Sequence, residues 1–197
     1  MATMREAVQR YFEENGFGAD GGYASPWVDF KLGPIPFPLP NTPSRVRAVR
    51  FHDLHHVLTG YRTDIVGEFE ISAWEIAAGC RDFHAAWVLN LSGIAGGVFR
   101  SPVRTFKAFV RGSCERTTYG LDYDALLDRD VEDLRRELGI GDAAHPARIV
   151  DVLRFVLSAV TGLVVGLLLM VVLLSPVTLV LWWRGRAAKG ASVVAGG

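Results

Sequence analysis

The feature that most constrains this chain is a long stretch without charge near its C-terminal end. Residues 155–183 contain no Asp, Glu, Lys or Arg over 29 positions, whereas about 20 apolar residues are enough for a helix to cross a bilayer core. Pro176 lies within the stretch and is expected to kink such a helix. Two tryptophans end the stretch and basic residues follow it, as at a membrane interface. We therefore predict one tilted or kinked transmembrane helix; a buried core helix is the alternative.

The rest of the chain divides by composition. Residues 1–43 hold a short amphipathic helix and a Gly- and Pro-rich arm in which prolines alternate with apolar residues. Alternating prolines forbid a helix and remove sheet donors, so an extended arm is expected, and residues 27–32 could pair with it as a small hairpin. The predicted fold class is all-α, a helical domain plus one C-terminal transmembrane helix. The helical domain is predicted over residues 44–140 and a linker over 141–154. A basic, flexible tail is predicted over 184–197.

The charge balance and the cysteines indicate which partners and which cellular compartment to expect. The formal net charge is zero, so nothing in the charge balance supports a nucleic-acid partner. Cys80 and Cys114 are too far apart for a CxxC motif, and free thiols in a reducing compartment are expected. No secretory signal opens the sequence, and the basic residues on the two sides of 155–183 are nearly balanced. We expect a single-pass protein of a bacterial inner membrane with its helical domain in the cytoplasm.

The densest group of metal-capable side chains lies between His52 and Glu68. His52 and His56 are four residues apart, so on a helix they share one face. Asp53 lies beside them, and Glu68 follows His56 after eleven residues. Gly60 ends the first helix and a second helix begins shortly after it, so a tight connection brings Glu68 back towards the histidines. This hairpin predicts a divalent-metal site with ligands His52, Asp53, His56 and Glu68. Two half-buried histidines beside an acidic helix start are the alternative.

Two classes of metal enzyme fit this spacing poorly. A metalloprotease has a glutamate after its first histidine as general base, and the side chain of Asp53 is too short for that role. A phosphohydrolase with a His-Asp pair needs a histidine well upstream, and none precedes His52. His55 points about 100° away from His52 on a helix and is not expected to bind the ion. Glu75 lies two turns after Glu68 and could support a ligand or act as the catalytic acid or base; a salt-bridged or solvated glutamate is the alternative.

Two further helices are expected after the hairpin. Residues 83–99 are mostly apolar and carry Gly93 and Gly97, a spacing that permits close helix packing. We interpret this helix as the wall of an apolar cavity or as a helix that touches the membrane. The next helix begins at Ser101-Pro102 and has an apolar side and a basic side. It either lies on an anionic leaflet or has a solvated basic face above the core. The residues predicted to face lipid or the membrane are Phe106, Phe109, Arg104, Lys107 and Arg111.

At the metal motif the sequence resembles the family of the fourth coenzyme Q biosynthesis protein, called here the coenzyme-Q-four family. The mark of that family is a His-Asp-x-x-His pair followed by eleven residues and a glutamate, and this chain fits it without a gap. The matching residues are His52, Asp53, His56 and Glu68. The run YGLDYDALLDRDVEDLRRELGI at 119–140 is similar to the family's C-terminal segment. The resemblance covers residues 44–140, and a membrane helix after that range is not a usual feature of the family.

The resemblance implies an all-helical domain, often a dimer, that is peripheral to a membrane. It implies a divalent ion, with zinc as the expected one, held by the four matching residues. It also implies an apolar groove for a polyprenyl chain and a role in ubiquinone synthesis. There the family is described as the catalyst that decarboxylates and hydroxylates the ring at carbon one, and as an organiser of the other quinone-biosynthesis proteins.

Three functional hypotheses follow. In the first, a polyprenylated quinone precursor lies in an apolar groove between the helices over 83–99 and 101–111, and the ion stabilises charge as carbon dioxide leaves. Glu75 or a water would then handle protons. In the second, the chain is a non-catalytic scaffold that binds lipid and neighbouring enzymes and has a structural metal. In the third and weakest, it is a metal-dependent lipid hydrolase. A closed shell of four ligands favours the scaffold, and an open coordination position favours catalysis.

Overall fold

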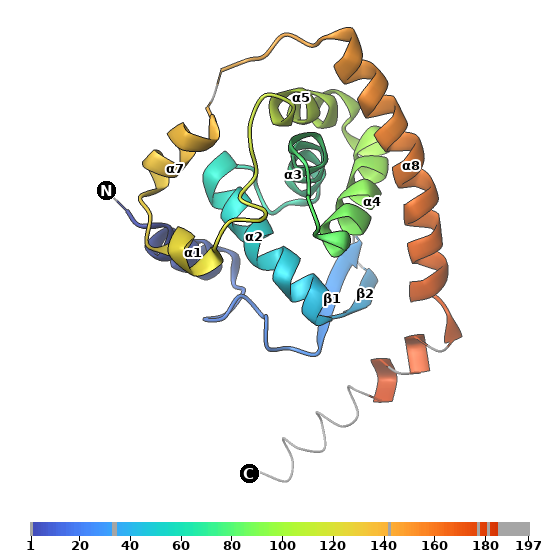
Figure 1. The fold of residues 1–197 in the computed structure, drawn as a ribbon. Coiled ribbons are helices and arrows are strands. Elements are labelled where there is room, and N and C mark those ends of the chain that lie inside the picture. The colour runs from blue at the N-terminus through green and yellow to red at the C-terminus, as the bar shows by residue number, and fades with distance from the viewer. Residues whose placement is uncertain (1, 33–34, 142, 177, 181, 185–197) are drawn as a thin grey trace.

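The computed structural model (Figure 1) describes residues 2–32, 35–141, 143–176, 178–180 and 182–184. Within them the chain is mostly helical with a small two-stranded hairpin, which confirms the predicted fold class of helices with one long apolar helix. The helices are α1 (Met4–Asn15), α2 (Pro43–Thr59), α3 (Ile65–Ala78), α4 (His84–Arg100), α5 (Pro102–Gly112), α6 (Tyr123–Leu127), α7 (Val131–Leu138) and α8 (Ile149–Leu173). The strands are β1 (Trp27–Leu32) and β2 (Ile35–Pro40). The tail predicted over 184–197 lies outside the described residues, apart from Arg184.

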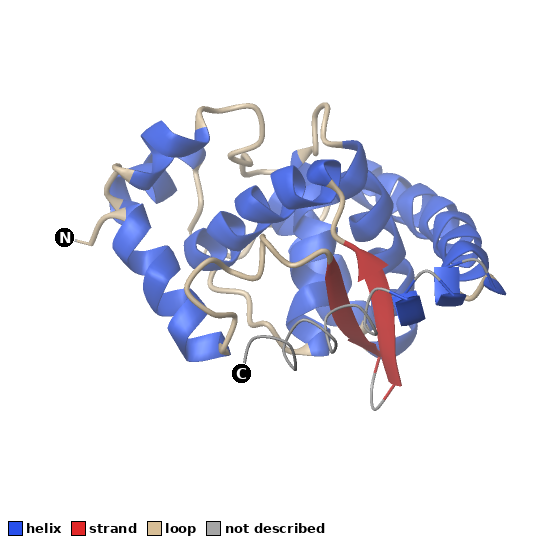
Figure 2. Cartoon of the chain, turned by 90° about the horizontal axis from the view of Figure 1, so that it is seen from below, coloured by secondary structure: helices blue, strands red, loops and turns tan. Residues whose placement is uncertain are grey.

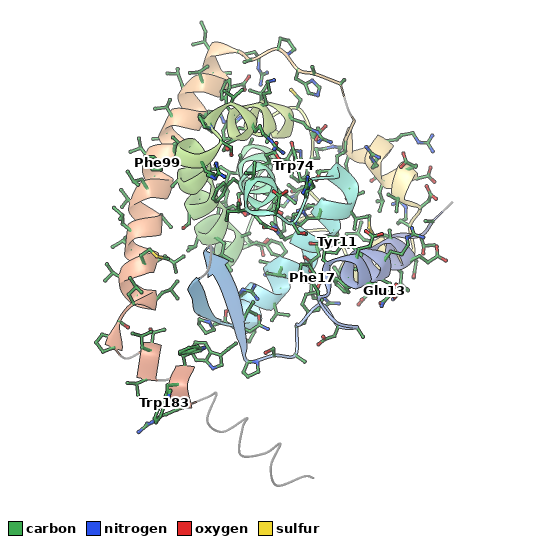
Figure 3. The ribbon with its side chains drawn as sticks, turned by 180° about the vertical axis from the view of Figure 1, so that it is seen from behind. Tyr11, Glu13, Phe17, Trp74, Phe99 and Trp183 are labelled. Carbon is green, nitrogen blue, oxygen red and sulfur yellow. The ribbon has the colours of Figure 1, made fainter. Side chains whose placement is uncertain are left out.

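Helix α3 forms the centre of the domain. Figure 1 shows it end-on with α2, α4 and α5 around it, and it packs most closely on α4 and α5. Trp74 of α3 is fully buried, in the middle of the side chains drawn in Figure 3. Two glycines of α4 allow the close approach: a Cβ at Gly93 would overlap Ser72 of α3. A Cβ at Gly97 would overlap Thr105 of α5. The close packing predicted from this glycine spacing is confirmed.

The ends of α2 and α3 set the geometry of the hairpin that carries the predicted metal ligands. Thr42 accepts a hydrogen bond from a first-turn amide of α2, and Gly60 ends that helix in the left-handed conformation, with φ at 73°. The cap of α3 is Asp64. The Asp64 carboxylate accepts hydrogen bonds from two amides of the first turn, whereas Thr63 hydrogen-bonds to Asn15 of α1. The connection between the two helices is therefore also fastened to the N-terminal helix.

The proline-rich arm forms the hairpin that the sequence allows. β1 and β2 are antiparallel, with Trp27 opposite Pro40 and Leu32 opposite Ile35. Prolines at every second position of β2 place the missing N–H groups on one edge of the strand, so the other edge can still pair with β1. The hairpin lies at the end of the domain where α2 begins (Figures 1 and 2) and contacts α8.

The uncharged stretch does not form a single helix over 155–183. α8 begins at Ile149, within the range predicted as a linker, because Asp151 accepts a hydrogen bond from the amide of Arg148 and so caps the helix start. It ends at Leu173, shortly before Pro176, whose ring disfavours helical backbone in the preceding residue. Among the described residues, α8 is the helix that is long and apolar enough to cross a membrane.

α8 lies along the outside of the domain rather than apart from it. It packs on α4, and Figure 1 shows the two helices side by side and running in roughly opposite directions. Gly162 makes the closest approach, since a Cβ there would overlap the backbone oxygen of Leu91. At the start of α8, Arg154 donates a hydrogen bond to the backbone oxygen of Ala77 at 3.1 Å, and Phe155 packs on two rings of α5.

The aromatic residues of α5 do not face lipid as predicted. Phe109 is 1% exposed and belongs to the core, and Phe106 is half-buried. Both rings contact Phe155, because α8 covers this side of α5. The apolar faces of α4 and α5, which were expected to line a groove for a polyprenyl chain, pack instead on α3 and α8.

The basic side of α5 is largely neutralised. Arg104 donates two hydrogen bonds to the carboxylate of Glu70, at 2.9 and 2.6 Å. Arg111 pairs with the buried Glu115 at 3.1 Å. Lys107 is exposed. Of the five side chains predicted to face the membrane, Lys107 and Arg104 are the exposed ones, and Arg104 has a partner in the domain.

The docking of α8 predicts different effects for two glycine substitutions. Gly162→Ala should lower the free energy of unfolding by about 1–3 kcal/mol, because the new methyl group overlaps Leu91. Gly166→Ala should be neutral or stabilise by up to about 1 kcal/mol, since alanine favours a helix and the nearest atoms would lie 3.7 Å from the methyl group. Thermal unfolding of both variants in one detergent measures the difference. Equal shifts would contradict the docked arrangement.

Candidate metal centre

Two imidazoles and one carboxylate meet between α2 and α3. His52 and His56 lie one turn apart on α2, and their Nε2 atoms are 3.2 Å apart. Glu68 in the first turn of α3 faces both rings. One carboxylate oxygen lies 3.4 Å from Nε2 of His52, and the other lies 3.3 Å from Nε2 of His56. Among the described residues, these three form a group that could hold a metal ion. The hairpin therefore brings together three of the four predicted ligands.

The spacing of these donor atoms fits a divalent ion. Ligand atoms about 2.0–2.1 Å from a tetrahedral zinc ion are about 3.3–3.4 Å from one another. The two Nε2 atoms here are 3.2 Å apart, and each lies 3.3 or 3.4 Å from a different oxygen of Glu68. With one ligand atom taken from each residue, the three atoms lie within 4.8 Å of one another. Two histidine nitrogens with one carboxylate are also a ligand set of catalytic zinc sites. The residues present therefore suit such an ion, and zinc in particular stays a prediction.

Hydrogen bonds on the far side of each ring aim both Nε2 atoms at this position. Nδ1 of His52 lies 2.8 Å from an oxygen of Glu75, and Nδ1 of His56 lies 2.9 Å from the backbone oxygen of Tyr61. Because both partners are acceptors, each Nδ1 donates; Nε2 then carries the lone pair in the neutral ring and donates to Glu68 in the protonated ring. Carboxylates and carbonyls behind histidine ligands fix the ring and its tautomer in metal sites. The two rings are thus oriented as ligands by groups outside the ligand set.

Glu75 is fully buried and accepts hydrogen bonds from four side chains. His52 and His55 donate to one oxygen, at 2.8 and 2.7 Å. Tyr119, at 2.6 Å, and Asn90 donate to the other. Four donors occupy the lone pairs of one carboxylate. Of the roles that the sequence leaves open for Glu75, the contacts favour support of a ligand over acid-base catalysis.

The ionisable groups of the centre shift one another's pKa values. Burial opposes the charge of Glu75, but His52 and His55 outweigh it and hold the pKa of this carboxyl well below its usual range. Burial also opposes the charge of Glu68, and hydrogen bonds from His52 and His56 lower its pKa to about 2. Burial lowers the pKa of His55, whose Nε2 accepts hydrogen bonds from a backbone amide and a hydroxyl. His55 therefore has no nitrogen left for an ion, in line with its expected role.

Asp53, the fourth predicted ligand, does not join this group. Its carboxylate accepts hydrogen bonds from the hydroxyl of Tyr23 at 2.5 Å and from that of Tyr11 at 3.4 Å. Because Asp53 directly follows His52, it points about 100° around α2, towards the N-terminal segment rather than towards α3. Burial raises the pKa of Asp53, and the hydrogen bond from Tyr23 opposes that rise. The prediction of Asp53 as a ligand is therefore corrected: this side chain fastens the N-terminal segment to α2.

The N-terminal segment forms one wall of the centre. The ring of Tyr11 stacks on that of His56, with ring centroids 5.6 Å apart. Sequence reasoning misses this wall and the partners of Glu75, because most of these residues lie outside the motif at 52–68 and no local pattern marks them. The missed residues are Tyr11, Tyr23, Tyr61, Asn90, Thr118 and Tyr119.

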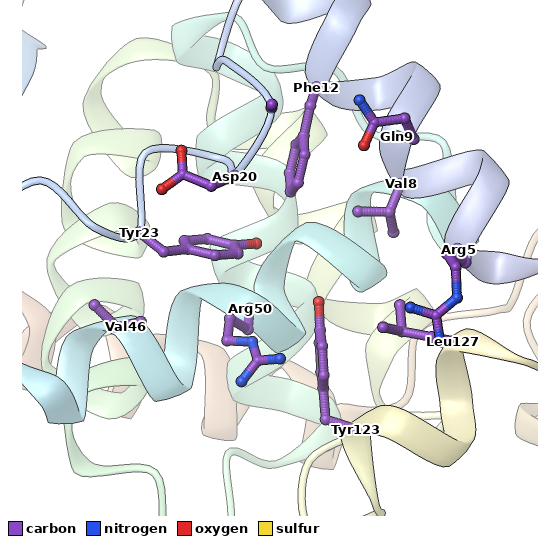
Figure 4. Close-up of a pocket in the computed structure, with 11 residues that line it drawn as sticks. Arg5, Val8, Gln9, Phe12, Asp20, Tyr23, Val46, Arg50, Tyr123 and Leu127 are labelled. Atoms are coloured by element: carbon purple, nitrogen blue, oxygen red, sulfur yellow. The ribbon is translucent and has the colours of Figure 1, made fainter.

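A pocket of about 410 Å³ opens on the other side of Tyr23 (Figure 4). Residues of α1, α2 and α6 line it, and the guanidinium of Arg50 lies 3.9 Å from the ring centre of Tyr123 there. Tyr23 lines this pocket and also donates a hydrogen bond to Asp53, the residue that follows His52 on α2. The lining of the pocket includes none of the three ligand residues.

Comparisons with known proteins give no match. No protein-family model, no curated protein and no solved structure matches the chain. The chemical interpretation of the centre therefore depends on the geometry of its own residues and on the sequence motif.

Metal affinity should depend on Glu75 although it does not face the ion position. Glu75→Gln removes the charge and two acceptor sites, so His52 loses its fixed orientation, and we expect zinc affinity to fall about 10–100-fold. Glu70→Gln on the same helix is the matched control and should leave the affinity unchanged. Competition with a chromophoric chelator measures both, while near-UV circular dichroism shows that each variant is folded. Equal affinities would contradict the supporting role of Glu75.

Asp53 and Glu68 should differ in their effect on bound metal. Asp53→Asn should keep the metal content of the wild type, because its carboxylate faces the two tyrosines and not the ligand group. Glu68→Gln should lose most of its metal, because it weakens one of three ligands. Elemental analysis of both proteins after dialysis measures the content. Metal loss in Asp53→Asn would return Asp53 to the ligand set.

Proposed function

We propose that this chain is a metal-dependent, membrane-associated protein of ubiquinone synthesis that binds a polyprenylated aromatic acid and removes its ring carboxylate at carbon one. The observation that carries the proposal is a centre of two imidazole nitrogens and one carboxylate, spaced for one ion. The side chains of His52 and Glu68 are 19% and 31% exposed, so a small head group has access to the centre. The fit of this motif to the coenzyme-Q-four family supports the pathway.

The proposed chemistry assigns a role to each residue of the centre. A divalent ion bound here would supply positive charge that stabilises negative charge on the substrate oxygens, and His52, His56 and Glu68 would hold it. The bond between the ring and the carboxylate carbon breaks, its electron pair stays on the ring carbon, and that carbon takes a proton from water. Glu75 is buried beneath His52, so it positions this ring and does not carry the proton. Hydroxylation at the same carbon would need dioxygen and an external two-electron donor.

The number of ligands favours this function over a structural metal. Structural zinc sites are closed by four protein ligands, whereas catalytic sites use three and keep one position open. Asp53 is the residue that could close the shell, and Tyr11 and Tyr23 hold its carboxylate elsewhere. The scaffold and the lipid hydrolase are therefore outcomes of the test below.

The proposal places the protein at a bacterial inner membrane, with its helical domain on the cytoplasmic side. The length and apolar composition of α8 support a membrane location. The apolar faces of α4 and α5 are packed within the domain, so they are not proposed as the site of the polyprenyl tail. A homodimer and contacts with other quinone-biosynthesis proteins stay predictions.

The decisive experiment uses a precursor labelled with ¹³C in its ring carboxylate. Membranes from cells that express His52→Ala or Glu68→Ala should release labelled carbon dioxide about a hundredfold more slowly than wild type, because the charge stabilisation at the reacting oxygens is lost. His84→Ala, an exposed histidine at the start of α4, is the matched control and should behave as wild type.

Quinone levels in the same cells separate the alternatives. Decarboxylation predicts that both ligand variants lose quinone and accumulate the carboxylated precursor. Unchanged quinone in folded, metal-free variants would support a scaffold and refute the enzyme. Loss of ester or phosphate hydrolysis with normal quinone would instead identify a lipid hydrolase.

A further inference from the structure

The outward side of α8 is more apolar than the side that faces the domain, whereas a helix on a water-soluble protein has its apolar side inward. A stripe of buried and half-buried residues runs from Asp151 to Leu173 and faces the domain. About half of this stripe is small or polar, including Ser158, Gly162 and Gly166, and the rest is apolar, including Phe155 and Leu169. The outward side consists mostly of large apolar residues, with Thr161 and, near the start of the helix, Arg154 as the polar ones. The apolar residues include Leu153, Leu157, Val160, Val164, Leu167, Leu168 and Val171. A helix that faces water would bury these residues and expose the stripe.

A lipid environment fits a helix whose large apolar side chains point outward. In a bilayer, helices meet through small residues that let backbones approach closely, and large apolar side chains face the acyl chains. The contact between Gly162 and the backbone of Leu91 is of this kind. An exposed apolar surface of this length marks a membrane or protein contact rather than ordinary surface.

The surface continues beyond α8 onto the adjoining helices. Phe99 of α4 is 77% exposed, beside α8 in Figure 3, and Val103 of α5 is 65% exposed. Two exposed cations, Arg100 and Lys107, border this part of the surface. Lys107 lies one turn after Val103 on the same side of α5. An apolar surface with cations at its rim is complementary to a leaflet that contains anionic lipid.

The charged ends of α4 decide how α8 can lie in that leaflet. α4 has 17 residues and is about 25 Å long, shorter than the hydrocarbon core of about 30 Å. Asp82, paired with Arg47, lies just before α4, and Arg100 ends it. If α8 crossed the bilayer while docked on α4, at least one of these charged ends would enter the hydrocarbon, which is strongly unfavourable.

We infer that α8 stays docked on α4 and lies in the plane of one leaflet. Its outward side, with Phe99 and Val103, enters the acyl region, while Arg100 and Lys107 contact anionic headgroups. The domain then takes the place of the polar side that other in-plane helices have. This arrangement differs from the crossing that the sequence predicts, which requires α8 to leave α4. It does not depend on the chemistry of the metal centre, so loss of metal should leave it unchanged.

Depth measurements along α8 test the inference. Leu153, Val160 and Leu167 of α8 and Leu174, which caps its C-terminal end, are exposed and spaced by seven residues, so they follow one side of the helix. In a Cys114→Ser background, each is changed to Cys and labelled with a small fluorophore; Cys80 is buried and should stay unlabelled. The proteins are bound to vesicles of phosphatidylethanolamine and phosphatidylglycerol with shallow or deep brominated acyl chains.

An in-plane helix predicts the same shallow quenching at all four positions. Glu13→Cys, on the far side of the domain in Figure 3, is the matched control and should not be quenched. Deep quenching at Val160 and Leu167 with shallow quenching at the two ends would show a crossing and overturn the inference. No quenching at any position, with cross-linking between Val160→Cys copies, would show that a second chain covers this surface and would also overturn it.

Binding to the same vesicles tests the cations at the rim. Arg100→Gln and Lys107→Gln should each weaken the partition coefficient about fivefold, and the differences should vanish on phosphatidylcholine vesicles. Arg10→Gln removes one charge from α1 and should have no effect. An equal effect of all three variants would show that only overall charge matters and would refute the oriented contact.

Discussion

The buried carboxylate of Glu75 is the group on which most of the domain depends. It is fully buried, and a charged group in that position is tolerated only when hydrogen bonds replace its water. Its four donors come from α2, from α4 and from the segment before α6. Since Glu75 itself belongs to α3, one carboxylate connects the central helix with three parts of the chain that are distant in sequence. Removing any donor would leave a buried lone pair without a partner.

The hydrogen bonds of Glu75 also orient the side chains of the candidate metal centre. The bond from His52 to Glu75 fixes the ring whose other nitrogen faces Glu68, one of the three ligand residues. Two acidic residues of α3, Glu68 and Glu75, thus lie on either side of one imidazole and act in different ways. Glu68 is partly exposed and available to an ion, while Glu75 is sealed from it. A site of this kind keeps its geometry without the ion, because the protein alone orients its nitrogens.

The sequence predicts those parts of the centre that local geometry determines. Helical spacing puts His52 and His56 on one face, and a short connection returns Glu68 to them. The same helical spacing also argues against Asp53 as a ligand, because a residue adjacent to His52 points in a different direction on the helix. Its partners, Tyr11 and Tyr23, are about forty and thirty residues upstream. No periodicity or motif encodes such distant contacts, so the N-terminal wall of the centre emerges only from the packed fold.

The long apolar helix α8 also shows what the sequence leaves undetermined. Length and lack of charge identify α8 from the sequence, but a crossing helix and a helix that lies in a leaflet need the same composition. What separates them is the side of α8 that the domain covers, and that depends on the backbone contact between Gly162 and Leu91. While α8 is docked on α4, any position that α8 takes in a membrane also fixes the position of α4. Because α4 is charged at both ends and shorter than a hydrocarbon core, the packing of one glycine would bear on how the whole domain lies at a membrane.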